Sequence, residues 1–444
     1  MHQRRRSFNW PLEHCSYAPG RRWTFLSVPQ TPLLELTKNG SGAVFLRGSL
    51  PWLPNLTYIS VLSLVPVLYS LNGSWYTLMH TTDQISHPTL PIIVSADDHM
   101  EVCFLPADLW TSRLPRALRD IGPRVVNVGG GPEWRCEDAG WGPWGRSLPE
   151  LSVRTDGFTP GDPNDRLRDM DHDGVFAQII YAPFSGFPVT QTALRVHVLQ
   201  AYNDWALEYS SNNRDRLVLL AQLPCHSPAA AVSELLRAAN CGHRGMQLDL
   251  NDGADPVYEQ AWETFWATAN DVGVPISLHI FGGLHSLRAP TRDSWRRPAL
   301  VSVLPLQLDE IMAGLVFSGI LERYPKVRVV FGETGIGWLP YILGRFDHEY
   351  HRYRDRLRDY RLRQLPSELA ARQVFFTWEE DAVGIELIDR LPLSNLMWAS
   401  DYPHFDSTWP NSRAALATLI DRIGEAAVRR VASSNAAGLY GINL

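Results

Sequence analysis

The chain has 444 residues, of which 45% are hydrophobic and 20% are charged, so it is long enough to bury a large core. A formal net charge of -6 argues against nucleic acid or an anionic membrane as the main partner. The five cysteines are scattered without a Cys-x-x-Cys pair, which argues against a disulfide framework and a structural zinc site. We therefore expect a globular, cytoplasmic protein.

Residues 1–90 differ from the rest of the chain, because they show neither helical nor strand periodicity over a useful length. The apolar run Ile59–Leu68 is interrupted by Pro66, is too short to span a bilayer and lies too far along the chain for an ordinary signal peptide. One interpretation is a targeting arm or membrane anchor. We favour an irregular, poorly ordered extension, with Met79 as a plausible true start.

From Ile92 onward, apolar runs rich in β-branched residues alternate with segments of helical spacing. The first predicted strand begins at Ile92 and ends in Asp97 and His99. The other seven are Val175–Tyr181, Leu217–Leu223, Gly245–Leu250, Pro275–Ile280, Val327–Phe331, Val374–Trp378 and Leu396–Ser400. The predicted helices between them include Pro106–Asp120, Gln191–Asn212, Val257–Asp271, Ala299–Tyr324 and Trp338–Arg358.

Eight strands, each followed by a helix, predict a parallel sheet with right-handed crossovers. Over residues 91–444 this number of units predicts an α/β domain, the (β/α)₈ or TIM barrel, with its functional site at the carboxyl ends of the strands. The alternative is an open doubly wound sheet. We favour the barrel because no Gly-x-Gly-x-x-Gly turn follows the first strand.

A segment rich in Gly and Trp, residues 129–145, follows the first predicted helix. Its glycines Gly129–Gly131 could cradle a phosphate, but no Lys-Ser/Thr follows them and no helix begins there. A Trp-rich lid or wall over a pocket is the better interpretation. An ordered surface loop is the alternative.

Side chains that bind metals stand at the ends of four predicted strands. Strand one ends in Asp97 and His99, which the alternation of a strand places on one face. Strand five ends in His279, strand six in Glu333 and strand eight in Asp401. Two carboxylates and two imidazoles can hold one divalent ion and leave a position open for water or substrate. Zinc is the first choice, and Mn²⁺ or Fe²⁺ are alternatives.

Several roles are open for the individual residues. Asp401 or Glu333 can accept a proton beside a metal-bound water, although Asp401 could also cap the helix that follows Pro403. Glu333 could instead be a ligand, or hold an imidazole in one tautomer. His404 is a candidate substrate contact near the mouth of the barrel, and Glu101 is a candidate partner of a ligand.

Four motifs together resemble the amidohydrolase-related family, which groups with aminocarboxymuconate-semialdehyde decarboxylase, resorcylate-type decarboxylases and small lactone hydrolases. The motifs are Ser95–His99, Asp169–Val175, Glu333–Pro340 and Ser400–His404. The resemblance runs from about Ile92 to the C-terminus and implies a metal-dependent barrel acting on a small, often aromatic or unsaturated carboxylic acid. Members are commonly dimers or larger, so a homodimer is one expected assembly.

The resemblance also implies a metal-ligand role for four single residues. The implied metal ligands are Asp97, His99, His279 and Asp401. The residues expected in catalysis are Asp401, Glu333 and His279, and the expected substrate contacts are His404, Trp338 and Tyr402.

This chain departs from the family at two positions. Many members have His-x-His or Glu-x-His on strand one, where this chain has Asp97 and His99, and the decarboxylases usually carry His where this chain has Glu333. We predict an enzyme of the decarboxylase type, because the named relatives are decarboxylases. A metal-dependent hydrolase of a lactone, amide or related bond is the alternative that Glu333 favours. A non-catalytic barrel that binds or scaffolds is a third hypothesis, which a missing ligand would mark.

Overall fold

The computed structural model describes residues 90–145, 161–183, 186–250, 253, 255–280, 294–358 and 361–444, together with the backbone of five short strands before residue 79. The chain divides into two compact units, Met1–His87 and Pro88–Leu444. This division falls beside the predicted boundary at residue 90. The role of the first unit, and Met79 as a start, stay predictions, since Met79 lies outside the described residues.

The first unit contains regular structure that the sequence pattern did not predict. Its five strands form one antiparallel sheet in the order β1-β2-β3-β4-β5. The strands are β1 Glu35–Lys38, β2 Val44–Arg47, β3 Thr57–Ser60, β4 Val67–Leu71 and β5 Ser74–Leu78. Each has only four or five residues, too few for a period of two to stand out in the sequence.

The second unit is built on parallel strands in two hydrogen-bonded runs, β11-β10-β6 and β12-β13-β14-β15-β16-β17. Only Leu220 separates β11 from β12, so these two are halves of one strand. The strands are β6 Ile93–His99, β10 Val175–Tyr181, β11 Leu217–Leu219, β12 Ala221–Leu223, β13 Met246–Leu248, β14 Ile276–His279, β15 Val329–Gly332, β16 Val374–Trp378 and β17 Leu396–Trp398.

The sheet closes on itself between its last and first strands. The backbone N–H of Asp401 donates to the carbonyl of Asp97 (3.0 Å), and that of His99 donates to the carbonyl of Tyr402 (2.7 Å). The result is a closed barrel of eight parallel strands in chain order. The predicted (β/α)₈ fold and its eight strand positions are confirmed, and the open sheet is excluded.

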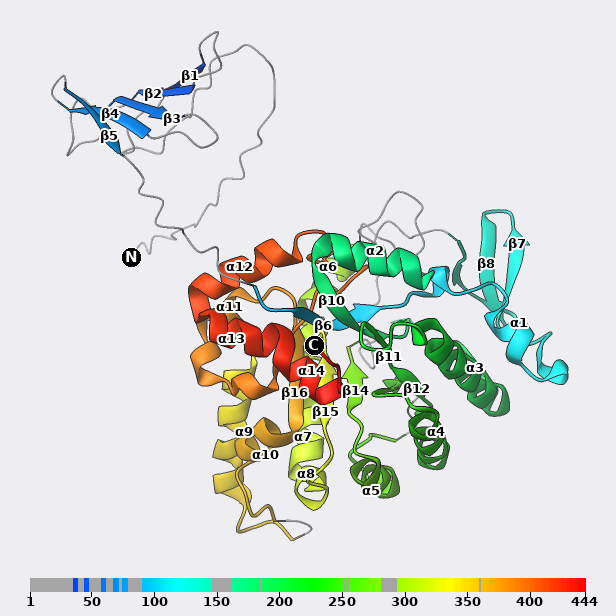
Figure 1. The fold of residues 1–444 in the computed structure, drawn as a ribbon. Helices are drawn as coiled ribbons and strands as arrows, with labels where there is room; N and C mark the ends of the chain where they lie inside the picture. The colour runs from blue at the N-terminus through cyan, green and yellow to red at the C-terminus, as the bar shows by residue number, and fades with distance from the viewer. Residues whose placement is uncertain are drawn as a thin grey trace, which may run out of the picture. The chain divides into compact units, whose positions relative to one another are not determined.

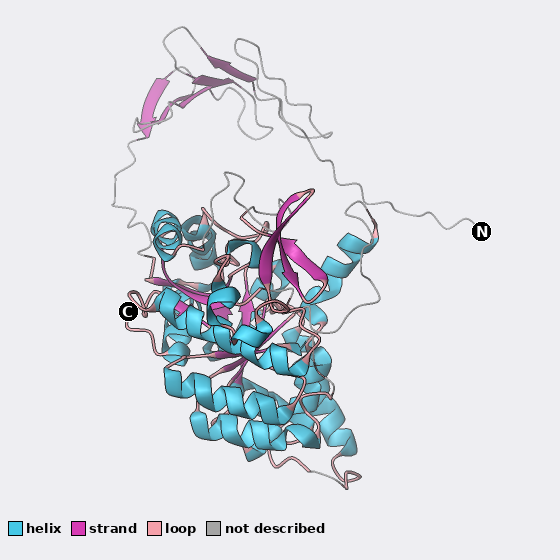
Figure 2. Cartoon of the chain, turned by 90° about the vertical axis from the view of Figure 1, so that its right-hand side faces the viewer, coloured by secondary structure: helices cyan, strands magenta, loops and turns pink. Residues whose placement is uncertain are grey.

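Helices form an outer layer around the strands, as Figures 1 and 2 show. The longer ones are α2 Pro163–Asp173, α3 Thr192–Ser210, α4 Pro228–Cys241, α5 Glu263–Val272, α7 Asp309–Phe317, α9 Leu339–Tyr353, α10 Pro366–Gln373 and α12 Ser412–Ile423. Their ends follow local chemistry. Helix α4 begins where the Ser227 side chain accepts from the N–H of Ala230, and it ends at Gly242 in the left-handed conformation (φ 98°).

The helix predicted as Val257–Asp271 begins later, at Glu263. Two other predicted helices are interrupted, and proline or glycine is the reason. The segment predicted as Pro106–Asp120 forms only α1 Leu109–Arg113 before Pro115 interrupts it. The segment predicted as Ala299–Tyr324 is divided into α6 Arg296–Val303, α7 and α8 Ile320–Arg323. Pro305 and Gly319 lie at the two breaks.

The stretch Arg296–Phe317 is apolar and long enough to cross a membrane by length and composition alone. In the fold it belongs to the outer helical layer, where Met312 and Leu315 of α7 are fully buried. Packing into the core therefore accounts for the apolar residues of α7, whereas α6 has no buried residue and only 28% of the most apolar window of the stretch is buried.

The segment rich in Gly and Trp forms an antiparallel sheet, and its role as a lid or wall over a pocket stays a prediction. Its strands are β7 Arg124–Val128, β8 Gly131–Cys136 and β9 Ala139–Pro143. Gly129 and Gly130 form the two-residue turn between β7 and β8, which explains the glycines without a phosphate. The indole N–H groups of Trp134 and Trp144 donate to the carbonyls of Val102 and Leu105, so this sheet is attached to the segment that follows β6.

The inside of the barrel is apolar at its amino end. Val94, Ala177, Leu220 and Val330 meet there with the C-terminal helix α14 (Asn435–Tyr440). Tyr440 is 1% exposed and its hydroxyl lies 3.4 Å from the Oγ of Ser277. Helix α14 thus closes the end of the barrel opposite the functional residues.

Tyr440→Ala tests this closure. The change leaves a cavity under the barrel, and we expect a loss of about 3 kcal/mol or more in the free energy of unfolding, measured by urea denaturation. The control is Tyr341→Ala, where the side chain is 72% exposed and the expected change is within about 0.5 kcal/mol. Equal, small effects would mean that α14 does not support the barrel.

Candidate active site

Asp97 and His99 stand at the carboxyl end of β6 and face the inside of the barrel. The pairing of β6 with β10 shifts register between Ser95 and Asp98, so Ala96 and Asp97 both turn inward. The Nε2 of His99 lies 3.5 Å from the Oδ1 of Asp97, and both side chains are fully buried. Asp98 points the other way, as the alternation predicted.

His279, at the end of β14, joins Asp97 to Glu333. Its Nε2 lies 3.7 Å from the Oδ1 of Asp97 and 3.4 Å from the Oε2 of Glu333, which follows β15. Its Nδ1 lies 3.1 Å from the carbonyl oxygen of Ile280. Because a backbone carbonyl can only accept, the proton resides on Nδ1, and the lone pair of Nε2 is free for a metal.

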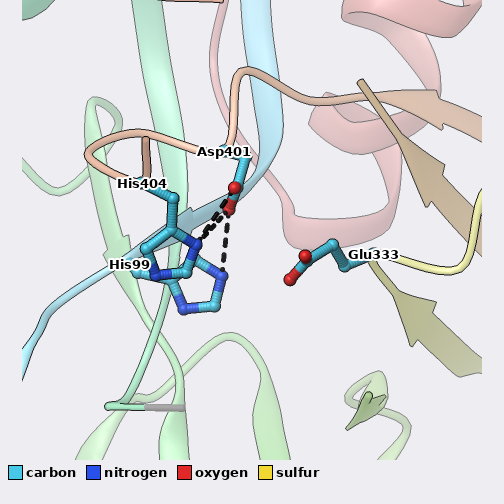
Figure 3. A group of neighbouring side chains, drawn as sticks. All are labelled: His99, Glu333, Asp401 and His404. Atoms are coloured by element: carbon cyan, nitrogen blue, oxygen red, sulfur yellow. Dashed lines mark hydrogen bonds and ion pairs between the residues drawn. The ribbon is translucent and has the colours of Figure 1, made fainter. Parts of the chain in front are cut away.

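Asp401 approaches the same group from the end of β17 (Figure 3). Its Oδ1 lies 3.3 Å from the Nε2 of His99 and 2.9 Å from the Nδ1 of His404. The rings of His99 and His404 are stacked with centroids 4.1 Å apart, and the Nε2 of His404 lies 3.3 Å from the Oε1 of Glu101. Figure 3 shows the carboxylate of Glu333 facing this cluster from the other side.

Several metal-ligating atoms in this cluster have no hydrogen-bond partner among the residues that the structure describes. Five residues each direct at least one buried atom without a hydrogen bond into the cluster: Oδ1 of Asp97, Nε2 of His99, whose Nδ1 also has no hydrogen bond, Nε2 of His279, Oε2 of Glu333 and Oδ1 of Asp401. Buried polar atoms are rarely left unpaired, so five that converge fit a cation. Within the described residues, two groups of side chains are spaced to hold a metal. The first consists of His99, Glu333, Asp401 and His404, and the second of Asp97, His99 and His279.

Thr377 of β16 connects two residues of the cluster. Its Oγ1 accepts from the backbone N–H of Glu333 (2.7 Å) and donates to the Oδ2 of Asp97 (2.6 Å). The hydroxyl therefore takes up the Oδ2 of Asp97 in a hydrogen bond and leaves its Oδ1 available to bind a metal. Gly332 provides the space, since a Cβ there would lie 2.6 Å from the Cδ2 of His279 and 2.9 Å from the Oδ2 of Asp97.

The site is rich in carboxylates, and their charges shift the pKa values. Burial raises the pKa of Asp401 to about 7, although the nearby His404 opposes the shift. Burial, and then the charges of Asp401 and Glu379, raise the pKa of Glu333 well above its usual range. Burial opposes protonation of His404, but Asp401 and Glu101 outweigh it and raise its pKa well above the usual value.

Sequence analysis missed Glu379, which follows β16 directly. Burial, together with the charges of Asp401 and Asp97, raises its pKa well above the usual value, and its Oε1 is buried without a hydrogen bond. The signal was present, because Glu379 follows a predicted strand as Glu333 does.

The structure places Trp338 and Tyr402 in contacts outside the ligand cluster. The Tyr402 hydroxyl donates to a carboxylate oxygen of Asp169 in α2, and its ring lies under the guanidinium of Arg166. The indole of Trp338 donates to the carbonyl of Thr334 (2.8 Å). Their role in substrate binding stays a prediction, whereas His404 does lie beside the predicted ligands.

Comparison with known proteins identifies a family and relatives of this chain. The sequence profile of the family described as amidohydrolase matches residues 147–442. A 2-amino-3-carboxymuconate-6-semialdehyde decarboxylase from Dictyostelium discoideum is 24% identical over 194 residues, which cover 43% of this chain and 52% of that protein. A γ-resorcylate decarboxylase from Rhodococcus jostii (strain RHA1) is 27% identical over 237 residues, which cover 46% of this chain and 68% of that protein.

Solved structures share the fold. A dihydroxybenzoic acid decarboxylase from Polaromonas sp. JS666, with bound manganese and the inhibitor 2-nitroresorcinol, matches with a TM-score of 0.53 and 18% sequence identity. The match covers 80% of this chain and 98% of that one. The alignment with the Dictyostelium relative spans only about half of that protein, so its activity does not transfer by similarity alone.

Metal analysis tests the cluster directly. We expect purified protein to hold about one divalent ion per chain, and Asp97→Ala and His279→Ala to lose it, since each removes one ligand. Chelation should lower the thermal midpoint, because the ion stabilises only the folded state. His351→Ala, at an exposed histidine, should keep the metal. A wild-type protein without metal and indifferent to chelator would contradict the site.

Thr377→Val tests the hydroxyl bridge between Asp97 and Glu333. Valine has nearly the same shape but cannot donate to Asp97, and we expect metal affinity to fall by about 10–100-fold, measured by calorimetric titration of Mn²⁺. Thr377→Ser should restore most of the affinity, because it returns the hydroxyl. Thr418→Val, at an exposed helical position, is the matched control. Unchanged metal affinity in Thr377→Val would show that the Thr377 hydroxyl does not contribute to metal binding.

Proposed function

Because this chain belongs to the amidohydrolase family, we propose that it is a metal-dependent decarboxylase of a small aromatic or unsaturated carboxylic acid. The observation that carries the proposal is the convergence of five buried, unpaired donor atoms at the carboxyl end of the barrel. The two decarboxylases among the relatives support this reaction class. A barrel without catalysis is disfavoured, because all four predicted ligands are present.

Asp97, His99, His279 and Asp401 would hold one divalent ion in this proposal. Zn²⁺ is our first choice for two imidazoles and two carboxylates, and Fe²⁺ is an alternative. Mn²⁺ gains support from the manganese in the Polaromonas enzyme. A bound divalent ion would polarise a substrate oxygen and offset the negative charge of the site.

Decarboxylation requires a proton for the carbon that loses its carboxylate. The bond from that carbon to the carboxylate breaks, its electron pair stays on the carbon, and a proton then replaces CO₂. Glu333 is the proposed donor, because its free Oε2 faces the cluster next to His279. Its raised pKa supports the role, since a buried carboxyl beside other carboxylates keeps its proton to higher pH.

Hydrolysis is the second candidate, and the identity of residue 333 favours it. A glutamate stands where the decarboxylases of the family usually carry histidine. In this version Asp401, 2.9 Å from His404, would accept the proton of the attacking water. The substrate would then be a lactone, an amide or a related compound.

A cytoplasmic location and a homodimer belong to the proposal as well. The four cysteines in the described part of the chain are free, and three of them are buried, as expected in a reducing compartment. The partner we propose is a small organic acid, with neither nucleic acid nor a membrane involved. The net charge of -6 supports this choice.

A substrate screen of the Mn²⁺- and Zn²⁺-loaded protein separates the two reactions. We expect CO₂ release from a panel that includes γ-resorcylate. Glu333→Gln should lower kcat by about 10²–10⁴-fold, because the amide cannot donate an acidic proton. Glu425→Gln, at an exposed site on the first turn of α13, is the control. Turnover of lactones without CO₂ release, lost in Asp401→Asn, would favour the hydrolase and reject the decarboxylase.

A further inference from the structure

The loop that carries Glu333 is held by a side chain from the next βα loop. Asp381 follows β16, and its Oδ2 accepts from the backbone N–H groups of Ile336 (2.7 Å) and Gly337 (2.6 Å). These two groups belong to the segment between β15 and α9. Successive N–H groups that converge on a carboxylate form a strong, charge-assisted contact.

The second oxygen of Asp381 serves its own loop. The Oδ1 accepts from the N–H of Gly384 (2.7 Å) and so caps the short helix α11 (Ala382–Glu386). Capping needs one oxygen only. The other oxygen makes both of its hydrogen bonds across to the Glu333 loop, which a simple helix cap does not explain.

The Glu333 loop is shaped for this contact. A Cβ at Gly337 would lie 2.9 Å from the Oδ1 of Asp381, and one at Gly335 would lie 3.1 Å from its Oδ2. Gly335 also has φ +61°, a conformation that side chains disfavour. The loop therefore has room for the carboxylate only where the chain places glycine.

Glu333 itself has φ +56°, so its backbone needs support from its surroundings. The N–H of Glu333 donates to the Oγ1 of Thr377. The N–H of Ile336, three residues after Glu333, donates to the carboxylate of Asp381. Both supports come from β16 and the loop after it, and Glu379 lies between them.

We propose that Asp381 is a positioning residue, which fixes the Glu333 loop so that the Glu333 carboxylate faces the cluster. The assignment rests on the proposed role of Glu333. It predicts that Asp381 acts on turnover through the geometry of this loop, with little effect on metal binding, because Asp381 contacts no predicted ligand through any described hydrogen bond.

The experiment compares Asp381→Ala and Asp381→Asn with Ser227→Ala, which removes the cap of α4 away from this loop. Steady-state kinetics, metal content and amide hydrogen exchange of the peptide 333–338 are measured on the metal-loaded full chain. We expect Asp381→Ala to lower kcat at least tenfold with little change in KM or metal content, and to speed exchange at Ile336 and Gly337. Asp381→Asn should recover part of kcat, because its amide oxygen can still accept both bonds.

Hydrogen exchange separates this proposal from the proposed function. If the wild type releases no CO₂ but exchange at Ile336 and Gly337 still accelerates in Asp381→Ala, the decarboxylase fails and the loop contact stands. If exchange accelerates while kcat matches the Ser227→Ala control, the positioning role is overturned. Loss of metal together with kcat would also overturn it, since Asp381 would then act through the ligands.

Discussion

Closure of the barrel between β17 and β6 is the constraint on which the site depends, because it brings the last strand against the first. Asp98 stabilises this junction between β17 and β6, which is called the seam below. Its Oδ1 accepts from the Oγ of Ser400 (2.5 Å) and from the N–H of Tyr402 (2.9 Å), the two neighbours of Asp401. The predicted ligands Asp97 and His99, on either side of Asp98, therefore lie beside Asp401. Burial raises the pKa of Asp98 to about 8, while the charge of Arg166 opposes the shift.

Arg166 reinforces the seam from the outer layer. Fully buried on α2, it donates to the carbonyls of His99 (2.8 Å), the last residue of β6, and Tyr402 (3.4 Å), in the segment that follows β17. A buried guanidinium is costly unless its donors are used, and here its Nε also binds the side chain of Gln178 (2.6 Å). Helix α2 therefore holds Arg166 against the β17–β6 junction and brings Asp169 to the hydroxyl of Tyr402.

The backbones of the acidic residues Glu333 and Asp401 also depend on support from neighbouring residues. Glu333 and Asp401 both have positive φ, at +56° and +54°, which costs about 1–3 kcal/mol each and requires support from neighbours. The seam supports Asp401, and Thr377 with Asp381 supports Glu333. The chain thereby gathers carboxylates that would repel one another, an arrangement that a divalent cation relieves.

The sequence by itself determined the strands, their parallel order and the family, because β-branched runs with helices between them permit few topologies. It also placed Asp97, His99, His279, Glu333 and Asp401 at strand ends, and the family was confirmed by the profile match. Only the tertiary structure decided which atoms converge, since Glu379, Thr377 and Asp98 act across hundreds of residues or from the opposite face of a strand. Hydrogen bonds between residues so far apart in the sequence leave no periodic signal in it. They form only when the barrel closes.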